Sequence, residues 1–197
     1  MPSANTNSES SDTSQLKLFA VYLGGRAPRC NTELHDVVFT VGASIEDTYH
    51  RLLELWFGSP EGLHIDSWME LSVVDHHRIR LTSEQIASDK KLYFVNLGAY
   101  AAGQFTELHA NAMFVAASEQ EVKTRAKAEL LVGKLTVHTD DLFDIDDCLE
   151  LMFVDGYSVR LEPTADASAL YPNNGYHVIP KPIIAKFIES RRHSGDR

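Results

Sequence analysis

The 197-residue sequence has little of several features that would narrow its class. It contains only two cysteines, Cys30 and Cys148, which excludes a disulfide framework and fits a reducing compartment such as the bacterial cytosol. No apolar run approaches the roughly 20 residues of a membrane helix. The first residues lack the basic start and apolar core of a secretory signal. We therefore expect a cytoplasmic bacterial protein with no membrane partner.

Positive charge is also scarce. Lysine and arginine number 18 against 28 aspartates and glutamates, which gives a formal net charge of −10. Nucleic-acid binding needs clustered Lys and Arg, so we expect no nucleic-acid partner. The apolar share of 44% is ordinary for a globular protein, and a chain of this length can bury a core without metal or disulfide support. Residues 1–15 are rich in Ser, Asn and Thr, which predicts a disordered tail.

The strongest signal is an internal repeat. Residues 17–24 align with residues 91–98, with many more matches along the two copies than composition alone would produce. The same shift aligns T-E-L-H at 32–35 with 106–109 and H-x-D at 64–66 with 138–140; after a short insertion, residues 70–81 align with 150–161. The chain is thus a tandem duplication of a small module.

Each copy predicts the element order ββαββ. Apolar residues on both faces of the first strand indicate a central strand. Ser44 and Ser118 open helices as capping-box-like starts, and Asp75-His76 and Asp155-Gly156 predict tight turns. Gly58 and Gly133 stand where a helix C-cap belongs. The predicted strands are 17–23, 34–41, 69–74 and 78–81 in the first copy, and 91–97, 108–115, 149–154 and 158–161 in the second.

These elements predict an α+β fold in which two ββαββ modules form a pseudo-two-fold arrangement, with a C-terminal helix. The first module spans residues 16–82 and the second residues 90–162. Residues 163–197 form a connection and an amphipathic helix over 183–192.

The repeated polar pairs are the first candidate site. Strand alternation puts Glu33 and His35 on one side, and His64 and Asp66 share a side if extended. Two imidazoles and two carboxylates suit a divalent transition metal such as Zn, Mn or Fe. The second copy offers Glu107, His109, His138 and Asp140 as the matching set. The alternative is structural, since a His hydrogen-bonded to a carboxylate or carbonyl orders a strand entry with the same atoms.

Two loops offer further candidates. Arg26 and Arg29 follow a glycine turn and would hold a carboxylate or phosphate, although a surface loop with solvated charges uses the same residues. Cys30 has no neighbouring sign of a nucleophile. The acidic run 140–147 lacks the central glycine and closing glutamate of a calcium-binding EF-hand loop, which favours a solvated loop.

The pattern V-x-L-G-G, E-L-H-D-V-x-F-x-V, E-D-T and L-H-I-D, with V-D-G-Y in the second copy, resembles the bacterial family of domain of unknown function 1543. That family is described as carrying one or two copies of its domain. The resemblance covers residues 16–161 and supplies no activity. Asp36 joins the candidate ligand-binding residues Glu33, His35, Arg26 and Arg29. The second copy has Ala110 in its place, so a site that needs this Asp is complete only in the first copy.

Three functions stay open, and no catalytic residue is assigned. The first, which we favour, is a non-enzymatic module that presents a groove between its copies to a small molecule or a protein. The second is a metal-dependent enzyme with Glu, His and Asp ligands at the strand entrances. The third is a structural protein that forms a homodimer or larger oligomer through a sheet edge or the C-terminal helix.

Overall fold

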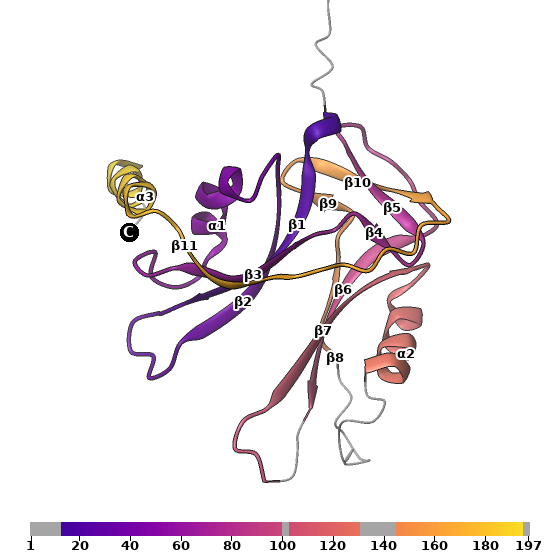
Figure 1. Ribbon diagram of the computed structural model, residues 1–197, viewed down its shortest axis with the longest axis horizontal. Coiled ribbons are helices and arrows are strands. Elements are labelled where there is room, and N and C mark those ends of the chain that lie inside the picture. The colour runs from indigo at the N-terminus through magenta and orange to yellow at the C-terminus, as the bar shows by residue number, and fades with distance from the viewer. Residues whose placement is uncertain (1–12, 100–102, 131–144, 195–197) are drawn as a thin grey trace, which may run out of the picture.

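The computed structural model describes residues 13–99, 103–130 and 145–194 and shows an α+β protein with three antiparallel sheets (Figure 1). Residues 1–12 of the expected tail, and Gly133, His138 and Asp140, lie outside the described residues. Residues 13–15 of that tail form a 3-10 turn, Thr13–Gln15, instead. No helix in the described ranges is long and apolar enough to cross a membrane.

The first sheet has the strand order β11-β3-β1-β2. Its strands are β1 (Lys17–Gly25), β2 (Leu34–Gly42), β3 (His64–Glu70) and β11 (Asn173–Val178). β1 lies between β2 and β3 and buries side chains on both faces, as its apolar sequence predicted. A 3-10 turn (Glu46–Thr48) leads into α1 (Tyr49–Leu55), and α3 (Lys181–Ser194) packs with α1 on this sheet (Figure 1).

The second half of the chain repeats this order in a smaller sheet, β7-β6-β8. The central strand is β6 (Lys91–Ala99), flanked by β7 (Leu108–Ala116) and β8 (Ile145–Glu150). The helix α2 (Glu119–Leu130) covers the sheet with Val122 and Ala126, both fully buried. Half of its predicted capping box forms: Ser118 Oγ accepts from Glu121 N–H, while the Glu121 carboxylate accepts from the N–H of Ala117, the residue before the N-cap.

A third sheet, β4-β5-β10-β9, joins the two halves. Each half supplies one hairpin: β4 (Val73–Val74) with β5 (His77–Thr82), and β9 (Phe153–Val154) with β10 (Tyr157–Pro163). β5 and β10 pair antiparallel, so that Arg80 lies opposite Arg160, its own equivalent in the repeat. The shared core beneath this sheet draws on both halves through Leu18, Ala20, Leu71, Ile79, Leu92, Phe94, Val115 and Val159.

The tips of the two hairpins cross over and make matching contacts. Asp155 accepts hydrogen bonds from the Val41 backbone N–H at 3.0 Å and from Arg51 Nε at 2.8 Å. Asp75 does the same for the equivalent residues of the other half, Val115 N–H and Arg125 Nη1, each at 2.8 Å. The predicted turns at these tips are confirmed by the positive φ angles of Asp75 and Asp155. Each hairpin therefore satisfies an edge strand of the opposite half.

Three sequence expectations were wrong. The third strands were placed at 69–74 and 149–154, but the chain forms β3 and β8 earlier and then the short β4 and β9. The segment 162–182 was read as a connection, yet residues 173–178 form β11, which pairs with β3 and keeps its own side chains exposed. Gly58 is no helix cap, because α1 ends at Leu55; the glycine instead lets the backbone pass close to Arg26 O and the Trp56 ring.

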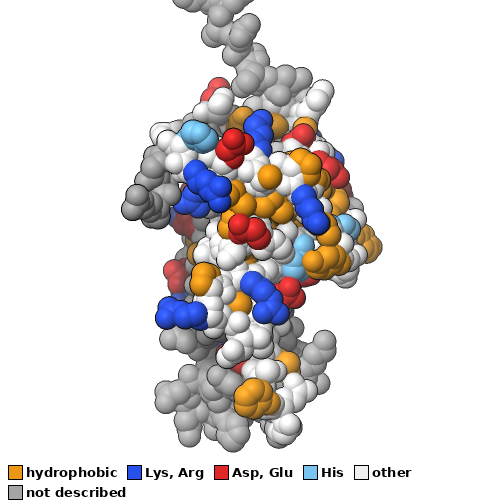
Figure 2. All heavy atoms as spheres, turned by 90° about the vertical axis from the view of Figure 1, so that its left-hand side faces the viewer, with side chains coloured by type: hydrophobic (Ala, Val, Ile, Leu, Met, Phe, Trp, Pro, Cys, Tyr) orange, Lys and Arg blue, Asp and Glu red, His pale blue; other side chains and the backbone are white. Residues whose placement is uncertain are grey.

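On the face that Figure 2 shows, basic, acidic and apolar side chains are interspersed. The chain as a whole is acidic, but its basic residues also gather locally. The last turn of the C-terminal helix α3 carries Arg191, Arg192 and His193. Cations at a helix C-terminus also complement the helix dipole.

Candidate functional site

Strand pairing brings Glu33, His35, His64 and Asp66 together at one end of the first sheet. In the registers of the sheet, Gly24 on β1 lies directly between His35 on β2 and His64 on β3. Residues opposite one another across antiparallel strands project to the same face. The two imidazoles are thus neighbours across a position that has no side chain of its own.

The four side chains contact one another closely. His64 Nε2 lies 3.4 Å from Glu33 Oε1 and 3.3 Å from Asp66 Oδ1. His35 Nε2 lies 3.2 Å from Asp66 Oδ2 and 3.9 Å from Glu33 Oε2. Each imidazole therefore faces both carboxylates. We refer to Glu33, His35, His64 and Asp66 as the His–carboxylate cluster.

His64 is the fixed member of the cluster. Its side chain is 2% exposed, whereas those of Glu33 and His35 are 45% and 36% exposed. His64 Nδ1 lies 2.9 Å from the carbonyl oxygen of Gly62. A carbonyl only accepts, so Nδ1 carries the hydrogen, and in the neutral ring Nε2 presents its lone pair to the carboxylates.

Two buried atoms of the cluster have no hydrogen-bond partner among the described residues: His64 Nε2 and Asp66 Oδ2. The approach of His35 to Asp66 Oδ2 is an ion-pair distance without hydrogen-bond alignment. Both atoms pack against Gly24, where a Cβ would lie 2.5 Å from each of them. Buried polar atoms are normally satisfied, so this pair singles out the cluster as a candidate site.

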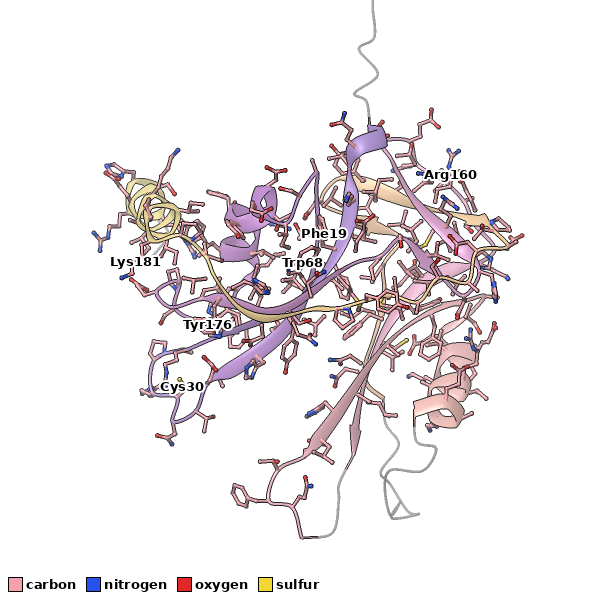
Figure 3. All side chains as sticks on the ribbon, viewed as in Figure 1. Phe19, Cys30, Trp68, Arg160, Tyr176 and Lys181 are labelled. Carbon is pink, nitrogen blue, oxygen red and sulfur yellow. The ribbon has the colours of Figure 1, made fainter. Side chains whose placement is uncertain are left out.

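Aromatic rings enclose the cluster on two sides. The His35 ring stacks on Tyr22 at 5.2 Å, nearly parallel at 4°. The His64 ring lies 4.3 Å from that of Tyr176, which is labelled in Figure 3 and belongs to the edge strand β11 beside β3. Burial, and secondly the negative charge of Asp66, raise the pKa of Tyr22. The Tyr22 side chain on β1 therefore lies close enough to Asp66 for the two to interact electrostatically.

As they stand, the described residues include no group of three or more His, Cys, Asp or Glu placed to hold a metal ion. The cluster atoms contact one another in pairs, and each carboxylate turns a different oxygen to each imidazole. A metal would therefore require small rotations of Glu33 and His35, the two exposed members, around the fixed His64.

The second copy shows part of the same arrangement. His109 Nε2 lies 3.8 Å from Glu107 Oε2, as His35 does from Glu33, and His109 pairs with Gly98 as His35 pairs with Gly24. The remaining members of the predicted set, His138 and Asp140, lie outside the described residues.

The predicted anion loop does not join the cluster. Arg26 and Arg29 are exposed between β1 and β2, and neither guanidinium forms an ion pair with another described residue. Cys30 lies at the end of this loop, and its sulfur accepts from the backbone N–H of Ala27 (Figure 3). Asp36 follows His35 on β2 and is no member of the cluster; its carboxylate accepts from Val37 N–H.

A groove of about 400 Å³ lies between the two halves beside the cluster. Residues that are equivalent in the repeat line it from both sides: Tyr22 with Asn96, His35 with His109, and Val37 with Asn111; Asp36, Phe94 and Leu149 complete it. His35 thus belongs both to the cluster and to the groove. The sequence pointed to His35, Asp36 and His109. It missed Tyr22, Asn96 and Asn111, because nothing in a strand pattern marks them as lining residues.

Comparison with known protein families shows which family this repeated fold belongs to. The sequence matches the family described as Domain of Unknown Function (DUF1543) over residues 30–81 and 104–161. The chain belongs to the DUF1543 family. The two matched segments fit a two-copy member, as the internal repeat indicated.

This DUF1543 protein is similar to a solved structure, the crystal structure of protein Il1583 from Idiomarina loihiensis. The two share 40% sequence identity with a TM-score of 0.68, over 84% of this chain and 99% of the other. No curated protein matches the sequence. The DUF1543 relationship therefore fixes the fold family, and function rests on the site itself.

Proposed function

We propose that the protein is a non-enzymatic binding module that takes a small molecule into the groove between its two copies. The observation that carries this proposal is the groove's lining by equivalent residues from both halves, Tyr22 and Asn96, His35 and His109, Val37 and Asn111. Its volume of about 400 Å³ falls within the range of roughly 300–1,000 Å³ typical of ligand pockets.

The proposal includes a pseudo-two-fold arrangement of the two copies, each of which runs ββαβββ in the described residues, one short strand more than the predicted ββαββ module. Three features support it: the antiparallel pairing of Arg80 with its equivalent Arg160, the matching contacts of Asp75 and Asp155, and the equivalent pairs across the groove. The groove then exists only because the two copies are held together by the central sheet. A bacterial cytoplasmic location belongs to the same proposal.

The lining selects the chemistry of the ligand. Of the described residues that line the groove, none is Lys or Arg, while Asp36 contributes a carboxylate. A phosphorylated or carboxylated ligand would find no fixed cation there. Phe94, Val37 and Leu149 offer apolar contact, and Asn96 and Asn111, which hydrogen-bond each other at 2.7 Å, offer amide donors and acceptors. We therefore propose an uncharged or cationic ligand with an apolar body.

The test is a ligand-observed NMR screen of neutral, cationic and anionic fragments against the full chain. Neutral or cationic hits should lose binding in Asn111→Trp, which fills the groove. They should bind normally to Ser168→Trp, which places the same bulk in a separate hollow beside β5. Hits that bind both variants equally, or a screen in which only anions bind, would overturn the proposal.

A further inference from the structure

We propose that the His–carboxylate cluster binds a divalent transition-metal ion, with His64 as its anchoring ligand. This site is separate from the groove ligand, although His35 borders both. The two proposals rest on different observations: the groove on its lining, and the metal site on unsatisfied atoms and their spacing.

The first step is the accumulation of acceptors. His64 Nδ1 lies 2.9 Å from the carbonyl oxygen of Gly62, and this contact turns Nε2 toward Glu33 and Asp66. Metal-ligating histidines in proteins typically have this partner on the other ring nitrogen, because it fixes the tautomer and the ring. Two carboxylates within 3.4 Å of one buried nitrogen repel each other unless a positive charge lies among them, and neither Nε2 nor Asp66 Oδ2 has a hydrogen-bond partner among the described residues.

The second step is spacing. Two ligand atoms bound at about 2.0–2.2 Å to a tetrahedral ion lie about 3.3–3.6 Å from each other. His64 Nε2 lies 3.4 Å from Glu33 Oε1 and 3.3 Å from Asp66 Oδ1, and His35 Nε2 lies 3.2 Å from Asp66 Oδ2. The two His64 separations match that spacing, whereas His35 Nε2 lies 3.9 Å from Glu33 Oε2 and approaches the other oxygen of Asp66. Binding one ion therefore requires Glu33 and His35 to turn toward a common centre with His64 and Asp66, which the described residues do not form as they stand.

The third step is space. The position beside Gly24 that a Cβ would occupy is bordered by His64 Nε2 and Asp66 Oδ2, the two atoms without partners. Any other residue at position 24 would place a carbon 2.5 Å from both. The glycine thus lets His64 Nε2 and Asp66 Oδ2 pack directly against the backbone of β1 and converge there, and the neighbouring strands carry the two imidazoles on either side of it.

The ligand set selects the class of ion. Two imidazole nitrogens and two carboxylates suit Zn²⁺, Mn²⁺ or Fe²⁺. Mg²⁺ and Ca²⁺ prefer oxygen ligands throughout, so imidazoles disfavour them. The exposure of Glu33 and His35, at 45% and 36%, provides the entry path, while His64 and Asp66 hold the inner positions.

The experiment titrates the chelator-treated full chain with Zn²⁺ by calorimetry and with Co²⁺ by its visible absorption bands, which report tetrahedral nitrogen and oxygen ligation. We expect saturable binding, weakened at least about 100-fold in His64→Ala. His50→Ala is the matched control: His50 lies on α1, outside the cluster, with its side chain 62% exposed, and the variant should bind as the wild type does.

Asp66→Asn keeps the test decisive if His64→Ala fails to fold. The amide has the same shape and gives His64 Nε2 a donor, so this variant should lose the metal while the metal-free protein becomes more resistant to thermal unfolding. Absence of saturable binding in the wild type, or equal affinity in Asp66→Asn, would overturn the proposal. So would a lower melting temperature of metal-free Asp66→Asn, because the cluster would then be an ion-pair network around a protonated His64. None of these results bears on fragment binding in the groove.

Discussion

The crossed hairpin contacts predict that Asp155→Ala strongly destabilises the whole chain. Asp155 lies at the tip of the second copy's hairpin, and its side chain is 15% exposed. Its carboxylate accepts from Thr40 Oγ1 at 2.7 Å, Val41 N–H at 3.0 Å and Arg51 Nε at 2.8 Å. All three donors belong to the first copy, so one substitution removes three links between the halves.

The magnitude follows from what each donor loses. A buried donor left without a partner costs about 1–3 kcal/mol, and Thr40 is fully buried. Arg51 is 44% exposed, so water compensates most of its loss and its ion pair adds less than about 1 kcal/mol. Together the free energy of unfolding should fall by about 3–5 kcal/mol. For a chain of this size that corresponds to roughly 6–20 °C in melting temperature.

Urea and thermal unfolding monitored by circular dichroism would measure this change. Glu162→Ala is the matched control, because it removes an exposed carboxylate that lies 3.7 Å from Arg80 Nε in the same sheet and should cost less than about 1 kcal/mol. Asp155→Asn should give an intermediate loss, since an amide oxygen still accepts from the backbone. A loss below about 1 kcal/mol in Asp155→Ala, or one no larger than that of the control, would refute the reasoning.

Three further predictions concern other parts of the fold. Asp75→Ala should cost less than Asp155→Ala in the same urea experiment, about 1–3 kcal/mol, because its side chain is 30% exposed and accepts from fewer donors; an equal or larger loss would contradict this. Gly25→Ala should lower stability by about 1–3 kcal/mol, because a Cβ would lie 2.9 Å from the buried ring of Trp56, and an unchanged melting temperature would show that the ring moves freely. Burial raises the pKa of Tyr93 in the folded state above its unfolded value near 10, so stability present below pH 10 should be lost as the pH rises through the folded pKa. Tyr93→Phe should reduce that alkaline loss in a pH series of urea midpoints, and an unchanged pH dependence would count against the assignment.

The repeat and the central strands could be predicted from sequence because they depend on local apolar patterns. Both copies keep the same apolar positions, and a strand that is apolar on both faces must be covered on both. The start of β3 was missed because His64 and Asp66 look like loop residues, whereas His64 is in fact 2% exposed. β11 was missed for the opposite reason: all its side chains are exposed, and only its pairing with β3 makes it a strand.

The sequence predicted the residues of the candidate site but not that they lie together. Retention of E-x-H and H-x-D in both copies identified Glu33, His35, His64 and Asp66, but their meeting depends on β2 and β3 flanking β1, which is a long-range pairing. Residue spacing could not show that His64 and Asp66 pack onto Gly24. The sequence did contain one indication, a glycine near the end of the same strand in both copies.

The shared central sheet has a consequence for how such a chain can change. In a symmetric assembly of two identical chains, every substitution appears twice, so a useful change on one side carries its copy on the other. Here one polypeptide supplies both halves, and each half can vary alone while the sheet still holds them together. The second copy has Ala110 where the first has Asp36, and the groove accordingly faces a ligand with two unlike walls. A site between such walls can grip an asymmetric molecule in a single orientation, which two identical walls could not do.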